Sequence, residues 1–269
     1  MLMLLGSSTQ QEAGPRSAAT TLLARGYADA CLEGAGVQVT GGQTVMNPWP
    51  LIGGVASSVV RSGEFVPVGG IKAGAVLVLT KPIGTQIAVN VWQWTKKDEL
   101  WNKFIESRGL EVDRTDEARA MYDTACESMV RLNRAGARLM LPHAAQGATD
   151  ITGFGIRGHA RNLARAQDVP VHIVLDALPV IAGTRKVGAV HTFFGLDDGF
   201  SAETSGGLLI AFPSAEAAEQ YRKRLLDDHK QVSWTVGHVV ARTEESTVGA
   251  RIADDADIIE VPEWPPRQV

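Results

Sequence analysis

The chain has 269 residues, of which 45% are apolar and 21% charged, and its formal net charge is −4. This length allows one large or two ordinary domains with a sizeable core. This mildly acidic charge does not indicate a basic surface for binding nucleic acid. No run of apolar residues approaches the roughly 18 that a membrane span needs. The apolar start, Met1–Leu5, is too short for a signal peptide and has no basic region before it. We therefore expect a cytoplasmic protein that binds neither nucleic acid nor membrane.

Hydrophobic periodicity predicts the elements of the first part of the chain. A strand is expected over Leu2–Leu5, a small-residue helix over Ser17–Ala35, and a second strand over Val37–Thr40. A longer strand follows over Leu51–Val60. These strands would form one sheet backed by the helix.

Two glycines follow the second predicted strand, in the segment Gly41-Gly42-Gln43-Thr44. Glycines at this place let the backbone approach a ligand closely, and Gln43 and Thr44 offer hydrogen bonds. The same residues also fit a bulge or a turn without a ligand. From the residue types alone, both interpretations stay open.

A glycine-rich loop over Gly63–Gly74 separates the first part of the chain from the rest. We place the domain boundary there, with one domain over residues 1–70 and the other over residues 71–269. Strands and helices mix along the chain without strict alternation, which favours an α+β fold over a doubly wound sheet.

The second part begins with a buried strand over Val76–Thr80 and a helix over Thr85–Trp94. Between them, Lys81 is either a point charge for a phosphate or a solvated residue at a strand end. The longest helical pattern runs over Asp116–Leu141. His172 alternates with apolar neighbours, and we expect it on the surface of a strand. Strand patterns follow at Val171–Leu175, Leu208–Phe212, Ser233–Val240 and Arg251–Val261, and Leu178–Ala182 is a short apolar segment.

The stretch Gly147–Gly155 combines glycines, hydroxyl groups and a carboxylate, and runs into a helical pattern. A glycine-rich turn before a helix suits phosphate, because backbone N–H groups and the positive end of the helix dipole meet there. Asp150 alone would repel phosphate, but Mg²⁺ joins carboxylates to phosphates. One interpretation is therefore a Mg²⁺–nucleotide site with Asp150 as a metal ligand. The other is that Asp150 or Thr152 caps the helix.

Five segments, in order along nearly the whole chain, carry a family resemblance. They are Met3-Leu4-Leu5, Gly41-Gly42-Gln43-Thr44-Val45-Met46-Asn47-Pro48-Trp49, Leu77-Val78-Leu79-Thr80-Lys81-Pro82-Ile83-Gly84-Thr85-Gln86, Ala148-Thr149-Asp150-Ile151-Thr152-Gly153-Phe154-Gly155 followed by Gly158-His159, and Glu203-Thr204-Ser205-Gly206-Gly207-Leu208-Leu209. This pattern resembles the selenophosphate synthetases, also called selenide, water dikinases, in their eukaryotic form.

The resemblance implies a two-domain fold like that of aminoimidazole ribonucleotide synthetase, with a remnant N-terminal α/β domain, a C-terminal α+β domain and a homodimer. It implies that Gly41, Gly42, Gln43 and Thr44 contact the nucleotide and that Asp150 binds Mg²⁺. The implied reaction converts ATP, selenide and water into selenophosphate, AMP and orthophosphate, with K⁺ as a further ion. The family's nucleophilic Cys or selenocysteine, a nearby Lys and further metal-binding Asp residues are expected upstream of residue 1. We therefore place no catalytic residue in this chain and expect it to be inactive alone.

Two other classes of function stay open. One is a non-catalytic, dimeric binding or regulatory paralogue of the same fold. The other is a different ATP enzyme of the fold, such as a thiamine-phosphate kinase or the purine synthetase, against which the Gly-Gly-Gln-Thr and Asn-Pro-Trp segments argue.

Overall fold

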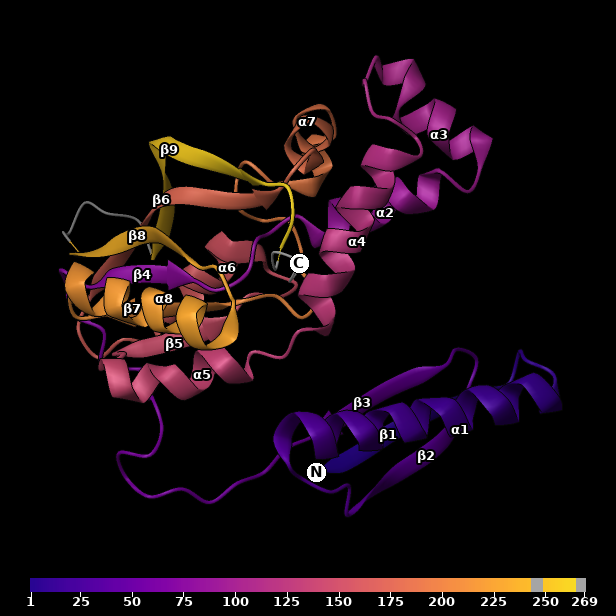
Figure 1. Ribbon diagram of the computed structural model, residues 1–269, viewed down its shortest axis with the longest axis horizontal. Helices are drawn as coiled ribbons and strands as arrows, with labels where there is room; N and C mark the ends of the chain where they lie inside the picture. The colour runs from indigo at the N-terminus through magenta and orange to yellow at the C-terminus, as the bar shows by residue number, and fades with distance from the viewer. Residues whose placement is uncertain (243–248, 265–269) are drawn as a thin grey trace. The chain divides into compact units, whose positions relative to one another are not determined.

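The computed structural model describes residues 1–242 and 249–264. Its contacts divide the chain into two compact units, unit 1 (Met1–Ser62) and unit 2 (Gly63–Val269). Figure 1 labels their elements, and each unit is described by itself. The domain boundary at residue 70 stays a prediction, and the glycine-rich loop Gly63–Gly74 lies in unit 2.

Unit 1 is a three-stranded sheet covered by one helix (Figure 1). The central strand β1 (Leu2–Ser8) runs parallel to β2 (Gly41–Asn47) and antiparallel to β3 (Leu51–Val55). Helix α1 (Ala13–Asp29) continues into a π-helical turn, η1 (Ala30–Ala35). Two contacts tie this helix to β1: the hydroxyls of Ser7 and Thr20 lie 2.9 Å apart, and the Tyr27 hydroxyl donates to the Leu2 carbonyl at 3.2 Å.

The second strand of unit 1 was predicted at the wrong place. Val37–Thr40 is not a strand, and β2 begins at Gly41. Gly42 pairs with Met3 at φ 144°, and a Cβ at Gly42 would overlap the Met3 carbonyl oxygen. A glycine is therefore required for this close pairing, and it lies inside the strand rather than after it. The next strand is also shorter than predicted, because β3 ends at Val55.

Unit 2 contains a six-stranded sheet in the order β5-β7-β4-β8-β6-β9. The strands are β4 (Val76–Leu79), β5 (Gly147–Asp150), β6 (Val171–Ile181), β7 (Leu208–Phe212), β8 (Trp234–Ala241) and β9 (Ala250–Val261). All neighbours are antiparallel except β6 and β9, which are parallel. The helices are α2 (Thr85–Trp94), α3 (Asp98–Phe104), α4 (Asp116–Val130), α5 (Arg134–Met140), α6 (Gly155–Arg165), α7 (Thr184–Val190) and α8 (Ala215–His229).

Alternation along β4 divides the core of unit 2 between the two faces of the sheet. Leu77 and Leu79 belong to the larger hydrophobic cluster, which includes buried residues of α2, α4 and α6. Val78 belongs to a smaller cluster with Phe212 and Tyr221, against which α5 and α8 pack. Because strands and helices are mixed and the sheet is mostly antiparallel, the α+β prediction is confirmed.

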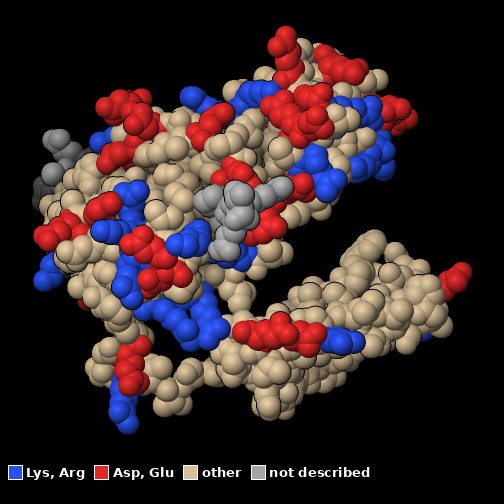
Figure 2. Space-filling model, viewed as in Figure 1, with Lys and Arg blue, Asp and Glu red and all other residues tan. Residues whose placement is uncertain are grey.

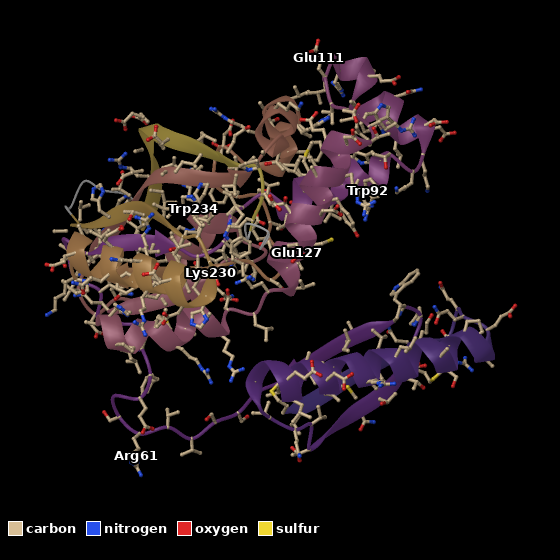
Figure 3. All side chains as sticks on the ribbon, in the orientation of Figure 1. Arg61, Trp92, Glu111, Glu127, Lys230 and Trp234 are labelled. Carbon is tan, nitrogen blue, oxygen red and sulfur yellow. The ribbon has the colours of Figure 1, made fainter. Side chains whose placement is uncertain are left out.

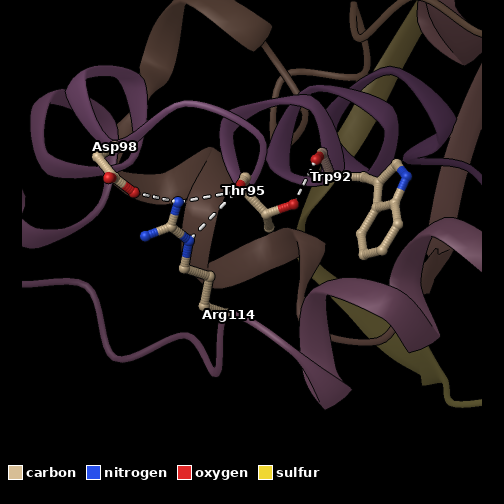
Figure 4. Close-up of polar contacts among 4 residues, drawn as sticks. All are labelled: Trp92, Thr95, Asp98 and Arg114. Atoms are coloured by element: carbon tan, nitrogen blue, oxygen red, sulfur yellow. Dashed lines mark hydrogen bonds and ion pairs between the residues drawn. The ribbon is translucent and has the colours of Figure 1, made fainter.

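The outer helices α2, α3 and α4 are joined by polar and aromatic contacts. The Arg114 guanidinium donates to the Thr95 carbonyl at 2.8 Å and to Asp98 at 2.6 Å, which ties the C-terminus of α2 to α3 (Figure 4). The Trp92 ring (Figure 3) stacks on Tyr122 with centroids 5.2 Å apart. Lys and Arg side chains alternate with Asp and Glu over the visible face of this unit (Figure 2). No helix among the described residues is long and apolar enough to cross a membrane.

The long helix predicted over Asp116–Leu141 is two helices. α4 ends at Val130, Arg131 is extended at φ −72° and ψ 121°, and α5 starts at Arg134. A long-range contact lies at the break, because the buried Lys81 ammonium binds the carbonyls of Ser128 and Arg131 there. Local periodicity carries no information about such a partner.

His172 was wrongly expected on the surface. Its strand β6 lies between β8 and β9, and its side chain is only 8% exposed. Burial, together with the positive charges of Arg251, Arg157 and Arg242, lowers the pKa of the imidazole. The two predicted segments on either side of residue 176 also form one continuous strand, β6.

Candidate functional site

Asp150 ends the edge strand β5 and pairs with Leu208 of β7. The segment Gly147–Asp150 is therefore a strand, and only the residues after it form the glycine-rich turn that was predicted for the whole stretch. Asp150 is exposed, and its carboxylate accepts no hydrogen bond from residues 1–242 or 249–264. The carboxylate is thus accessible to a cation.

The alternative role for Asp150 and Thr152, as side-chain caps of the next helix, is wrong. Helix α6 begins without a side-chain cap, and only the Thr152 carbonyl accepts from its first residue, Gly155, at 3.0 Å. The Thr152 hydroxyl lies 3.1 Å from Nε2 of His159, and the Thr152 backbone N–H donates to the same nitrogen at 3.0 Å. His159 therefore fixes the turn directly after Asp150.

Sequence reasoning assigned no role to His159. Burial lowers the pKa of its imidazole, and the negative charge of Asp150 acts in the opposite direction. The neutral ring accepts through Nε2 from the Thr152 amide. The signal that could have identified it was its place in the motif, because Gly158-His159 continues the Asp150 segment in the family pattern.

The segment Glu203–Gly207 lies against the Asp150 segment. The Ile151 N–H donates to the Gly207 carbonyl at 2.9 Å, and the Glu203 N–H donates to the Thr152 carbonyl at 3.0 Å. A Cβ at Gly206 would overlap the Ile151 carbonyl oxygen. The approach of the two backbones therefore requires glycine at this position.

Glu203 is a buried carboxylate, 5% exposed, that joins this segment to the start of α2. It accepts from the backbone N–H of Gly84 at 2.6 Å and of Thr85 at 3.0 Å, and also from the Thr85 hydroxyl. Burial raises its pKa from 4.5 to about 7, although the hydrogen bonds from Gly84 and Thr85 act against this rise. When ionised, it places negative charge at the N-terminus of α2, the positive end of the helix.

Lys81 is buried as well, and neither interpretation of it from the sequence was right. It is 1% exposed, and its ammonium donates to the carbonyls of Ser128 at 2.8 Å, Arg131 at 2.6 Å and Ser205 at 2.7 Å. Burial and the neighbouring Arg131 guanidinium lower its pKa from 10.5 to about 8. At neutral pH the amine therefore remains mostly protonated, with all three N–H groups bonded, and has no donor left for a phosphate.

A cavity of about 350 Å³ lies beside this junction of segments. Its lining is uncharged and includes Thr85 and Thr204, which flank the buried Glu203 carboxylate. The remaining lining residues are Gln86, Val89, Asn90, Tyr122, Met129 and Ala202.

The four candidate nucleotide-binding residues, Gly41, Gly42, Gln43 and Thr44, lie in unit 1 on β2. All four are exposed. β2 is an edge strand of its sheet, so its outer backbone groups have no strand partner within unit 1. Their role in nucleotide binding stays a prediction.

Asp150 is not part of a preformed metal centre among the described residues. Within residues 1–242 and 249–264, no group of three or more His, Cys, Asp or Glu side chains could hold a metal ion. The thiols of Cys31 and Cys126 are free, and Cys31 is buried. A cation at Asp150 would therefore need oxygen ligands from phosphate, water or other residues.

Comparison with known proteins gives the family. The protein-family model described as "AIR synthase related protein, C-terminal domain" matches residues 72–249. A selenide, water dikinase of Trypanosoma brucei brucei is 45% identical over 97% of this chain and 65% of that protein. A selenide, water dikinase of Dictyostelium discoideum is 42% identical over 97% of this chain and 71% of that protein. The chain belongs to the selenide, water dikinase family.

The chain spans about two thirds of the length of these two dikinases, 65% and 71%. Among solved structures, the hydrogenase maturation protein HypE in complex with ATP has a TM-score of 0.50, with 19% identity over 90% of this chain and 64% of that chain. This likeness shows the fold alone.

In this member of the selenide, water dikinase family, three of the five motif segments meet in unit 2. The Thr80–Thr85 turn, the Asp150–Gly155 turn and Glu203–Gly207 are joined through Lys81, Glu203 and backbone hydrogen bonds. Two buried ionisable side chains at one junction of loops mark it as the candidate functional site of unit 2.

Proposed function

We propose that this protein acts in the ATP-dependent synthesis of selenophosphate from selenide and water, with AMP and orthophosphate as the other products, for selenocysteine synthesis in the cytoplasm. The observation that carries the proposal is the identity of 42% to 45% to selenide, water dikinases over 97% of the chain. The junction of the motif segments around Asp150 supports it, because every segment singled out in unit 2 contributes to one place.

Asp150 is the proposed Mg²⁺ ligand of unit 2. Its exposed carboxylate, with no hydrogen bond from a described residue, fits a hard cation that takes one or two protein carboxylates plus phosphate oxygens. Mg²⁺, when bound, would neutralise charge on the transferring phosphates. The chain's own contribution is to hold the carboxylate still, through the Thr152–His159 contact and the Gly207–Ile151 hydrogen bond.

We assign nucleotide binding to Gly41, Gly42, Gln43 and Thr44. Glycines remove side chains from the edge strand, and the Gln43 amide and Thr44 hydroxyl supply hydrogen-bond donors and acceptors. ATP binding by a structure of the same fold, HypE, supports ATP as the substrate. K⁺ is proposed as a further ion of the phosphate site, with selenide as the second substrate.

A homodimer is proposed through the sheet face of unit 1 that α1 does not cover. Along β1, Leu2 and Leu4 point to one face of the sheet, and Leu5 and Ser7 point to the other. Ser7 contacts α1, so the face with Leu2 and Leu4 is the uncovered one. Five apolar side chains share the uncovered face and are between 39% and 58% exposed: Leu2, Leu4, Val45, Leu51 and Val55. The three strands contain no charged residue. An apolar sheet face of this kind is typical of an interface with a second copy.

The nucleotide product tests the proposal. ATP and selenide are supplied with Mg²⁺ and K⁺ under reducing conditions, and the assay is made with residues 1–269 and with the full-length product of the gene. AMP and orthophosphate, formed only with selenide present, support the dikinase. ADP alone would assign another ATP enzyme of the fold, and no turnover by folded full-length protein would favour the non-catalytic paralogue. We expect residues 1–269 alone to be inactive, because the nucleophile is expected outside them.

A further inference from the structure

Lys81 is the most deeply buried cation described in unit 2, and its position is not explained by binding a substrate. Lys81 lies two residues after the end of β4, and its side chain is 1% exposed. A charge in the interior is costly unless its hydrogen-bonding capacity is used. Three carbonyl oxygens, all within 2.8 Å of the ammonium, use it completely.

The three carbonyls come from two segments that are far apart in the sequence. Ser128 and Arg131 supply the C-terminal end of α4, where the helix dipole is negative. Ser205 supplies the third, from the loop that lies against the Asp150 segment. Lys81 therefore fixes that loop to both β4 and α4.

Ser205 adopts a conformation that is unfavourable for its side chain. Its φ is +49°, in the left-handed region that non-glycine residues rarely adopt. The next residue, Gly206, is in close contact with the Ile151 carbonyl, and Asn133 donates to the Gly206 carbonyl at 2.9 Å. An unfavourable backbone conformation persists only where its surroundings impose it, and the Lys81 ammonium binds the carbonyl of Ser205 itself.

We propose that Lys81 is a positioning residue that sets the path of Ser205–Gly207 and, through the Gly207–Ile151 hydrogen bond, the position of the Asp150 carboxylate. The effect of Lys81 on the backbone of Ser205–Gly207 does not depend on which reaction the protein catalyses. Its effect on turnover rests on the proposed function. Arginine could not replace Lys81 in this role. The three carbonyls converge on one point, which suits the compact ammonium of lysine but not the planar guanidinium of arginine.

Amide hydrogen exchange tests the effect on the backbone without any assay of activity. The probes are the N–H groups of Ile151, Glu203 and Leu208, which bind Gly207, Thr152 and the Thr80 hydroxyl. In Lys81→Met, we expect these amides to exchange about tenfold faster or more, while amides of β6, which lies between β8 and β9, keep their rates. The matched control is Lys223→Met, which removes an exposed lysine of the same unit and should change none of these rates.

Two results would overturn the proposal: unchanged exchange at all three amides in Lys81→Met, or an increase spread evenly over unit 2, which would reduce Lys81 to a general contributor to stability. If Lys81→Met does not fold, the double variant Lys81→Met/Ser205→Gly separates the alternatives. Glycine accepts φ +49° without a partner, so the double variant Lys81→Met/Ser205→Gly should recover folding and much of the protection. A double variant that recovers neither folding nor protection of the amides would also contradict the proposal.

Turnover gives the second test. In a protein active with ATP and selenide, Lys81→Met should lower kcat by about tenfold or more with little change in KM for ATP, because a displaced metal ligand weakens the transition state more than ground-state binding. A loss confined to KM would contradict a positioning role. If the wild-type protein has no turnover, the proposed function fails, while the exchange experiment still decides the role of Lys81.

Discussion

Replacing Glu203 with Gln should change how the stability of unit 2 depends on pH. Glu203 is 5% exposed and binds the backbone of Gly84 and Thr85. Burial raises its pKa from 4.5 to about 7. Between these two values the folded state holds a proton that the unfolded state has released, so the free energy of unfolding falls as the pH rises through this window.

The size of the effect follows from the same pKa values. At about 1.4 kcal/mol per pKa unit, a rise from 4.5 to about 7 corresponds to about 3 kcal/mol. This stabilisation is fully present below pH 4.5 and is lost as the pH passes about 7. The amide of the Glu203→Gln variant cannot ionise, so the variant should lack this component. Any constant cost of the amide at this position shifts its curve without changing the slope.

Urea unfolding followed by tryptophan fluorescence measures this difference. Five of the six tryptophans, all but Trp49, lie in unit 2 and therefore report on its unfolding. The control is Glu127→Gln, which removes an exposed carboxylate of α4 (Figure 3). The free energy of unfolding of the wild type relative to Glu203→Gln should fall by about 3 kcal/mol between the two ends of the window. Parallel curves for wild type, Glu203→Gln and Glu127→Gln would refute a raised pKa at Glu203.

Three further variants test the site and the interface. Gly206→Ala should destabilise unit 2 by about 1–3 kcal/mol in urea unfolding, because its Cβ would overlap the Ile151 carbonyl oxygen. Gly153→Ala in the neighbouring turn, where a Cβ meets nothing within 4 Å, should change stability by about 0.5 kcal/mol or less, and equal losses would contradict the contact. Leu4→Glu should convert a dimer into a folded monomer in sedimentation velocity, and an unchanged dimer would place the interface elsewhere. Asp150→Ala in an active protein should abolish Mg²⁺-dependent turnover with the melting temperature unchanged, and retained turnover would remove Asp150 from the site.

Elements set by local pattern could be predicted from the sequence. The helix over Thr85–Trp94 has the predicted bounds, and the Ser214 hydroxyl caps α8 by accepting from the Ala217 N–H at 3.2 Å, a contact between residues three apart. The glycine-rich turn leads into α6 at Gly155, also as predicted. In each case the deciding interactions lie within a few residues of one another.

Features set by distant partners could not be predicted in this way. The break after α4 coincides with the contacts of Lys81, which is 47 residues from Ser128. The strand of His172 has its place in the sheet through pairing with β8 and β9, and β2 starts where Gly42 pairs with Met3. The family resemblance selected the segments of the candidate site, but the chemical roles of Glu203 and Lys81 within it emerged only from the contacts of the folded chain.

We propose above all that this protein acts as a selenide, water dikinase and that Asp150 binds its Mg²⁺. The most direct test is the nucleotide formed from ATP by the full-length protein with and without selenide, in wild type and in Asp150→Ala. We expect AMP from the wild type only when selenide is present, and no AMP from the variant. ADP as the sole product, or AMP formed equally by both proteins, would contradict it.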